Sequence, residues 1–264
     1  MLLFAHRWRE EARSLAGWTI TAGLASFAVT VLAAVLVKTG ETARLLSAWM
    51  AQAPPALRGF FGGEAVVTDA LTRFALGTAF HALFPALILV YVCLAVAGIY
   101  TREAGRGNLE FLFSLPVERL HLVIGRVLVF LVNLAAVHLA FYLGTGAGLL
   151  LAGKRFEVAR AALALLNHYL LFACLGGLAF LLSLASRDYT KVLLVSLALF
   201  FGLFVFNLTE EAQETVLHHL NPYHYYRAIQ VIAGESPWRN CLVLAGAAVI
   251  AWTVGVGVYM RKQV

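Results

Sequence analysis

The sequence predicts an all-α membrane protein with six membrane-spanning helices. Of its 264 residues, 61% are hydrophobic and only 13% are charged, about half the charged share of an ordinary soluble domain. The mean hydropathy is +0.83. The apolar residues are gathered into runs of roughly 17 to 30 residues, and about 20 helical residues are enough to cross the hydrocarbon layer of a bilayer. These observations favour a single polytopic domain over residues 1–264.

The N-terminal residues 1–16 combine leucines with Trp8 and a mixture of acidic and basic side chains. This composition predicts an amphipathic helix that lies in the membrane interface and leads directly into the first span. The charges follow the apolar residues, and no small-residue cleavage site is visible. We therefore expect the first span to be an uncleaved anchor.

The six predicted spans are separated by polar segments that contain helix breakers. Residues 41–52, after the first span, have apolar side chains at helical spacing and predict a short surface helix, and Pro54-Pro55 and Gly62-Gly63 follow it. The spans cover about residues 17–37, 74–100, 122–152, 161–185, 192–208 and 241–259. Six spans place both termini on the same side of the membrane.

The Lys and Arg residues near the span ends favour cytoplasmic termini by a small margin. Of the 20 basic residues, the following eleven would lie inside: Arg7, Arg9, Arg13, Arg102, Arg106, Arg119, Arg126, Arg187, Lys191, Arg261 and Lys262. Lys154 and Arg155 fit this orientation worst, because it places their short loop outside. The net charge is +6, but the basic residues are scattered over every loop, so nucleic-acid binding is not expected.

The stretch REAGRGNLEFLFSLPVERLHLVIGR, residues 102–126, interrupts two apolar runs with a short helix of its own. Asn108 is a good N-cap for that helix, and Glu110 falls in its first turn, where a negative charge suits the helix dipole. Leu109, Leu112 and Phe113 then recur at helical spacing. This leaves too much apolar surface for a free cytoplasmic loop.

Pro116 cannot continue the short helix but suits the first position of a new one, so a bend is expected there. The new helix enters the membrane near Leu122, with Gly125 allowing a close helix contact and Arg126 able to reach the interface. On physical grounds alone, the segment is either a docking element for a soluble partner or an amphipathic helix resting on lipid headgroups.

The same stretch resembles the coupling-helix region of ABC-2 type transporter permeases, in particular the small permeases of bacitracin export and nitrous-oxide-reductase maturation. Asn108, Glu118 and Arg126 replace the usual Thr, Ser and Lys of the family pattern. The close motif covers about 25 residues, and the six-span layout extends a looser likeness over the chain. The matching residues are Glu103, Gly107, Leu109, Glu110, Leu112, Pro116, Val117, Arg119 and Gly125.

The resemblance implies a type V exporter-like architecture, in which a cytoplasmic coupling-helix loop, here residues 101–121, contacts separate ABC ATPase subunits. Two permeases and two ATPases form the working unit, so the expected partners are the ATPases, a second permease copy or paralogue, and membrane lipid. This chain would hold no cofactor, catalytic residue or metal, because the ATPase binds ATP and Mg. The implied ATPase-coupling residues are Glu103, Arg106, Gly107, Asn108, Leu109, Glu110, Phe111, Leu112, Phe113, Leu115, Pro116 and Arg119.

The family also has an outer re-entrant hairpin between its last two spans, and LHHLNPYHYYRAIQVI within residues 209–238 resembles it, with Asn221-Pro222 as the turn. The resemblance further implies that spans one and five face the second permease across the substrate pathway. Ser196 and Asn207, the polar residues of the apolar fifth span, are therefore candidates for lining that pathway. An apolar pathway favours a lipid-like or amphipathic cargo. The expected location is a bacterial or archaeal cytoplasmic (inner) membrane.

Histidines inside the predicted spans leave other functions open. His81, His138 and His168 could pack, line a path or bind haem. A haem- or quinone-binding redox subunit, and a non-transporting scaffold that anchors an ATPase, are the alternatives to an exporter. For the second cluster, His218, His219 and His224, an interfacial belt with neighbouring tyrosines is favoured over a metal site.

Three further patterns favour packing over chemistry. Gly144-x-x-x-Gly148 is a close-approach signature, and we expect it to pack within the subunit rather than at a dimer seam. Gly148–Arg155 matches the letters of a phosphate-binding loop but lacks the preceding strand and the following Ser or Thr. The three cysteines lie in apolar runs and are predicted to be reduced core thiols: Cys93, Cys174 and Cys241.

Overall fold

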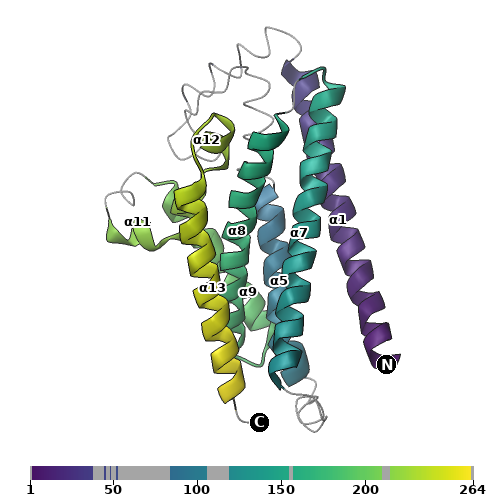
Figure 1. Ribbon diagram of the computed structural model, residues 1–264, viewed down its shortest axis with the longest axis vertical. Helices are drawn as coiled ribbons and strands as arrows, with labels where there is room; N and C mark the ends of the chain where they lie inside the picture. The colour runs from purple at the N-terminus through teal and green to yellow at the C-terminus, as the bar shows by residue number, and fades with distance from the viewer. Residues whose placement is uncertain are drawn as a thin grey trace. The chain divides into compact units, whose positions relative to one another are not determined.

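The computed structural model describes residues 2–37, 84–105, 119–154, 157–209 and 215–262, together with Leu45, Ala48 and Gln52. Every element in this part of the chain is helical (Figure 1). The long helices are α1 (Leu2–Val37), α5 (Phe84–Gly105), α7 (Arg119–Leu151), α8 (Val158–Ser183), α9 (Tyr189–Asn207) and α13 (Trp238–Arg261). The short ones are α11 (Val216–Leu220), the 3-10 helix η2 (Pro222–Tyr225) and α12 (Ala228–Ile232).

Six of the described helices are long and apolar enough to cross a membrane. The chain is therefore a multi-pass helical membrane protein, as its composition predicts. The third to sixth predicted spans correspond to α7, α8, α9 and α13, with ends that differ by a few residues. Apolar run length predicts these helices well because hydrocarbon leaves backbone groups no partners except those inside a helix.

The beginning of the chain is helical without interruption from Leu2 to Val37. This agrees with an N-terminal helix that leads directly into the first span, and the position of residues 1–16 in the membrane interface stays a prediction. The charged residues of the first turns are compatible with helix, so nothing in the local sequence ends it before the span. The first part of the second predicted span, residues 74–83, lies outside the described residues. Of the predicted surface helix at 41–52, only Leu45, Ala48 and Gln52 are described, and these are helical and exposed.

The chain forms two compact units. Unit 1 comprises Met1–Leu87, Ala135–Leu165 and Ala228–Glu235, and unit 2 comprises Ile88–Leu134, Leu166–Arg227 and Ser236–Val264.

Small residues allow α1 and α7 to pack closely in unit 1. A Cβ at Gly144 of α7 would overlap the carbonyl oxygen of Gly23 and Oγ of Ser26, and one at Gly148 would lie 2.7 Å from Cβ of Thr30. Ser26 Oγ also donates to the carbonyl of Phe141 at 3.0 Å. The prediction that the Gly144–Gly148 pair packs within the subunit is confirmed.

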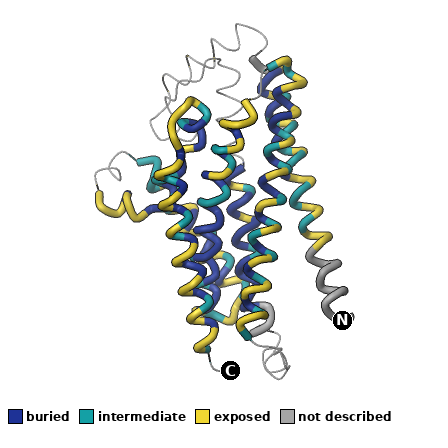
Figure 2. Tube along the Cα trace, in the orientation of Figure 1, coloured by how far each residue is buried: buried dark blue, intermediate teal, exposed yellow. Residues whose placement is uncertain are grey.

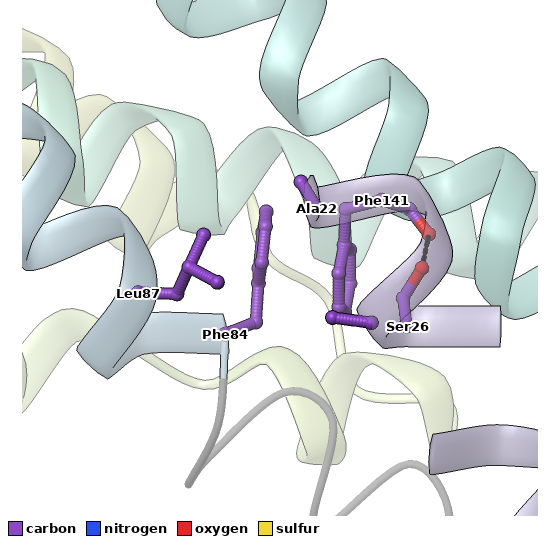
Figure 3. Close-up of a pocket in the computed structure, with 6 residues that line it drawn as sticks. Ala22, Ser26, Phe84, Leu87 and Phe141 are labelled. Carbon is purple, nitrogen blue, oxygen red and sulfur yellow. Dashed lines mark hydrogen bonds between the residues drawn. The ribbon is translucent and has the colours of Figure 1, made fainter. Parts of the chain in front are cut away.

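A hollow in unit 1 lies beside this contact and is almost entirely apolar (Figure 3). The Phe84 ring stacks on Phe141 with 3.4 Å between centroids, and His138 meets Phe84 edge-on. With a volume of about 10 Å³, the hollow is at the lower limit for one water molecule. Its lining is Ala22, Ala25, Ser26, Phe84, Leu87 and Phe141.

In unit 2, α13 packs along α8 through glycines and Trp252. The indole Nε1 of Trp252 donates to the carbonyl of Ala173 at 2.9 Å. Gly177 accommodates Ala251 and Trp252, while Gly255 leaves room for the Phe180 ring. Exposed residues nonetheless recur along α13 (Figure 2). Over their most apolar stretches, 61% of α8 is buried but only 17% of α9, so α9 presents most of its apolar surface to lipid or to another chain.

The three cysteines are buried and form no disulfide. This agrees with the predicted reduced core thiols.

A single methyl group at Gly144 tests the α1–α7 contact. Because this Cβ meets a backbone oxygen, Gly144→Ala should lower the free energy of unfolding by about 1–3 kcal/mol. Gly125→Ala is the matched control in the same helix, since its Cβ would meet nothing within 4 Å; it should be neutral or stabilise by up to about 1 kcal/mol. Thermal unfolding in detergent, followed by tryptophan fluorescence, measures both. Equal stability of the two variants would contradict this packing.

Candidate functional site: the helix ends beside the predicted coupling segment

Most of the predicted ATPase-coupling residues lie in a segment that the structure does not describe. Residues 106–118, which include the predicted coupling residues Arg106 through Pro116, fall outside the described residues. Glu103 is in the last turn of α5, and Arg119 is the first residue of α7, with a partly exposed side chain. The coupling helix itself stays a prediction, but the structure describes the helix ends on either side of it, the end of α5 and the start of α7.

The flanking helices α5 and α7 meet at one end of unit 2. The Nη1 atom of Arg126 donates to the carbonyl of Ile99 at 2.6 Å. This carbonyl belongs to the last turns of α5, and a cation there also opposes the negative end of the helix dipole. Helix α5 therefore ends and α7 begins at the same end of unit 2.

The C-terminal end of α13 joins the same group of helix ends. Tyr100 of α5 and Tyr259 of α13 pack edge to face, with centroids 6.2 Å apart. The Nζ atom of Lys262 donates to the carbonyl of Leu184, just after α8, and lies 5.0 Å from the centroid of the Tyr100 ring, within the range of a cation–π contact. Lys262 thus connects the ends of α5, α8 and α13.

The turn between α8 and α9 belongs to this end as well. The side chain of Asp188 caps α9 by accepting from the backbone N–H of Lys191 at 3.1 Å. Asp188 is the only acidic side chain described in unit 2. We call this region the basic end, and its described cations are Arg119, Arg126, Arg187, Lys191, Arg261 and Lys262.

The opposite end of unit 2 carries the segment that resembles the outer hairpin. Asn221 ends α11 and caps η2: its Oδ1 accepts from the backbone of Tyr223 at 3.1 Å, and its Nδ2 donates to the carbonyl of Leu203 in α9 at 2.7 Å. Pro222 occupies the first turn of η2, where a missing N–H costs nothing. The break between α11 and η2 thus falls at Asn221-Pro222, where the turn is expected, and the outer re-entrant hairpin stays a prediction.

Asn167 of α8 anchors the chain that leaves this turn. It is completely buried. Its Nδ2 donates to the carbonyl of Tyr225 at 3.1 Å, and its Oδ1 accepts from the backbone N–H of Arg227 at 2.9 Å. In the sequence, the only sign of this role is an amide in the middle of an apolar span, because the partners of Asn167 lie far along the chain.

The two candidate pathway residues lie on α9. Ser196 is completely buried, and Asn207 is the last residue of the helix. Neither Ser196 Oγ nor Asn207 Oδ1 has a hydrogen-bond partner within the described part of the chain. A role in lining a pathway stays a prediction.

The intramembrane histidines contact aromatic rings. His138 is buried against Phe84 in unit 1, and His168 is buried between Phe172 and Tyr226 in unit 2. His81 lies outside the described residues. Within the described residues, no group of three His, Cys, Asp or Glu side chains could hold a metal ion. Gly148, the first residue of the segment that matches the letters of a phosphate-binding loop, is helical and packs against Thr30.

Comparison of the chain with protein-family models and with curated proteins finds no match. The motif in residues 102–126 and the geometry of the helix ends beside it are therefore the guides to function.

Removal of the Asn167 amide should loosen the chain at Tyr225 and Arg227. Asn167→Ala leaves the part-buried carbonyl of Tyr225 and the part-buried N–H of Arg227 without their partner, at a cost of about 1–3 kcal/mol for the two bonds. We expect faster amide hydrogen exchange over residues 221–227 and a lower unfolding temperature. Asn133→Ala, at a half-buried asparagine of α7, is the control. Unchanged exchange in Asn167→Ala would show that the amide is not the anchor.

Substitution of Lys262 tests the connection between helix ends. Lys262→Met keeps an apolar stem but removes the cation from the Leu184 carbonyl and the Tyr100 ring, so we expect a loss of about 1 kcal/mol. Lys191→Met is the control, because the Lys191 side chain is exposed. Thermal unfolding of both variants at equal lipid and detergent content is the measurement, and equal stability would argue against the contact.

Proposed function

We propose that this chain is the transmembrane permease subunit of an ATP-driven ABC-2 exporter. It would have no ATP site of its own and would couple to separate ATPase subunits through residues 106–116, here called the coupling segment. The observation that carries the proposal is the capped, proline-bent motif in residues 102–126. Its position supports the same function, because it connects two membrane-spanning helices whose ends are joined at one end of unit 2.

The basic end is assigned to the cytoplasm. It holds six described cations, whereas the opposite end of unit 2 holds only Arg227 and Arg239 among the described residues. Positive residues concentrate on the cytoplasmic side of membrane helices. In this orientation the coupling segment faces the cytosol, where an ATPase can bind, and the turn at Asn221-Pro222 faces outward.

The proposed mechanism is rigid-body transmission. ATP binding closes the two ATPases, and the coupling segment moves with them. Its flanks are held by Arg126 on the Ile99 carbonyl and by Lys262 beside Tyr100, so a displacement would pass to α5, α7 and α13 instead of being absorbed in a loose loop. The result is a two-state change in the permease, biased by a ligand bound elsewhere.

The proposed pathway lies between two permease copies. Helix α9 supports this arrangement because its apolar side chains are widely exposed in the single chain: Leu194 by 60%, Leu199 by 45% and Phe201 by 59%. Such a surface would be covered by lipid, by a second copy or by a hydrophobic cargo. A lipid-like or amphipathic substrate fits this chemistry better than an ion.

Substitutions in the coupling segment test the function directly. The chain is purified with the ATPase subunits that copurify from its source, and ATP hydrolysis is measured in lipid with and without transport substrate. Glu110→Ala and Leu112→Ala should each lower substrate-stimulated hydrolysis by about tenfold, equivalent to about 1.4 kcal/mol, while the isolated ATPase is unchanged. Leu217→Ala, at a 62% exposed leucine at the opposite end of unit 2, is the control.

Two results would overturn the proposal. One is full coupling in both variants of an intact complex. The other is a map of the complex in which residues 106–116 lie in lipid or face the exterior with no ATPase in contact. Loss of transport without loss of hydrolysis in sealed vesicles would instead place the substitutions in the pathway.

A further inference from the structure

Three histidine rings converge between α11 and η2, at the end of unit 2 opposite the basic end. The ring centroids of His218 and His224 are 4.1 Å apart, those of His219 and His224 are 5.2 Å apart, and those of His218 and His219 are 6.0 Å apart. His218 Nε2 and His224 Nδ1 share a hydrogen bond of 2.5 Å. Such a bond needs one nitrogen with a proton and one without, so it cannot form when both rings are protonated.

We propose that the His218–His224 pair is an acid-sensitive contact that holds α11 against η2 and releases it on protonation. A second side-chain hydrogen bond between these helices runs from Tyr225 Oη to the backbone carbonyl of His219, at 2.9 Å, and does not depend on a histidine proton. The ring-to-ring bond is therefore the contact that acid can break. The inference is independent of any role of the chain in transport.

The surroundings of the pair oppose a positive charge. His218 is nine-tenths buried, and its Nδ1 has no hydrogen-bond partner among the described residues. A protonated His218 would therefore bury an N–H without an acceptor, which is costly. Burial of the ring lowers the pKa of His218, and the neighbouring charges of His219 and Arg227 lower it further.

The elements packed around the pair, η2, α13 and α9, supply no described group that would favour a protonated ring. Burial lowers the pKa of His224 to about 4, aided by the charges of His218, Arg227 and His219 and of Arg239 on α13. Helix α9 contacts η2 through the Leu203 carbonyl and the Phe204 ring, which do not titrate. Burial raises the pKa of Tyr223 in η2, so this phenol stays neutral. Three acidic residues before α11 lie outside the described residues: Glu210, Glu211 and Glu214.

The direction of the pH effect follows from these pKa values. While α11 is packed against η2, the pKa values of His218 and His224 lie below the ordinary value of 6.5. The contribution of the pair to stability is therefore complete above about pH 6.5 and is lost as the pH falls from there toward about 4. Acid should loosen α11 from η2 without displacing the junction between them, because Asn221 at that junction is fixed to α9 by an amide that does not titrate.

A spin label on α11 measures the release in the full chain. Leu220→Cys places a thiol at a 75% exposed position, whereas the native cysteines are buried and react slowly. The labelled protein in lipid nanodiscs is titrated from about pH 7.5 to about pH 4.5. We expect the label to become more mobile, with a midpoint between 4 and 6.5. A spectrum that does not change over this range overturns the proposal, whatever the variants show.

Glutamine variants assign the transition to the pair. His218→Gln and His224→Gln replace a titrating ring by a neutral amide and should abolish the pH-dependent change in mobility. His121→Gln, on the exposed first turns of α7, should keep it. A transition that persists in both cluster variants, or one that disappears when a chelator is added, would overturn the proposal in favour of other acidic groups or of a bound metal.

Discussion

The structure depends on the rule that polar groups within hydrocarbon must find partners inside the protein. Backbone groups find them within each helix. Some side-chain donors bind carbonyls of their own helix, such as Thr30 on Ser26, and others bind carbonyls on other elements. Trp252 binds the carbonyl of Ala173, Ser26 that of Phe141, and Arg126 that of Ile99. Each bond fixes one helix against another at a defined height. Packing through glycine then brings the backbones close enough for these short bonds to form.

The two ends of unit 2 use different chemistry for the same purpose. At the basic end, cationic side chains hold helix termini together, with Arg126 and Lys262 on carbonyls of α5 and of the chain after α8. At the other end, the neutral amides of Asn167 and Asn221 hold the turn. Charged groups suit an end that meets water and headgroups, because they keep part of their hydration. Amides suit buried positions, because they satisfy both a donor and an acceptor without a buried charge.

The sequence predicts what depends on local pattern and misses what depends on distant contacts. Long apolar runs predict the six spans, and Gly144-x-x-x-Gly148 predicts a close helix contact, because each signal lies within one helix. Asn167 as an anchor and Lys262 as a connector are not predictable in this way, since their partners lie far along the chain. The unbroken α1 also agrees with the local pattern, because the N-terminal amphipathic residues and the span are both helical and nothing marks a boundary. For the coupling segment, the motif is still the only guide.

Unit 2 links the two ends through α8, which carries Asn167 near one end and leads to Leu184 at the other. Any signal between the ends must alter the free-energy difference between two states of this helix and its neighbours, and the coupling would be reciprocal. Protonation of His218 and His224 changes the contact of α11 with η2 but leaves the amide bonds of Asn167 and Asn221 intact. The acid transition should thus remain local to α11, since neither anchor that joins the turn to α8 and α9 titrates. A stronger effect on the basic end would require Asn167 to lose its hold on Tyr225, and that bond is set by packing and not by pH.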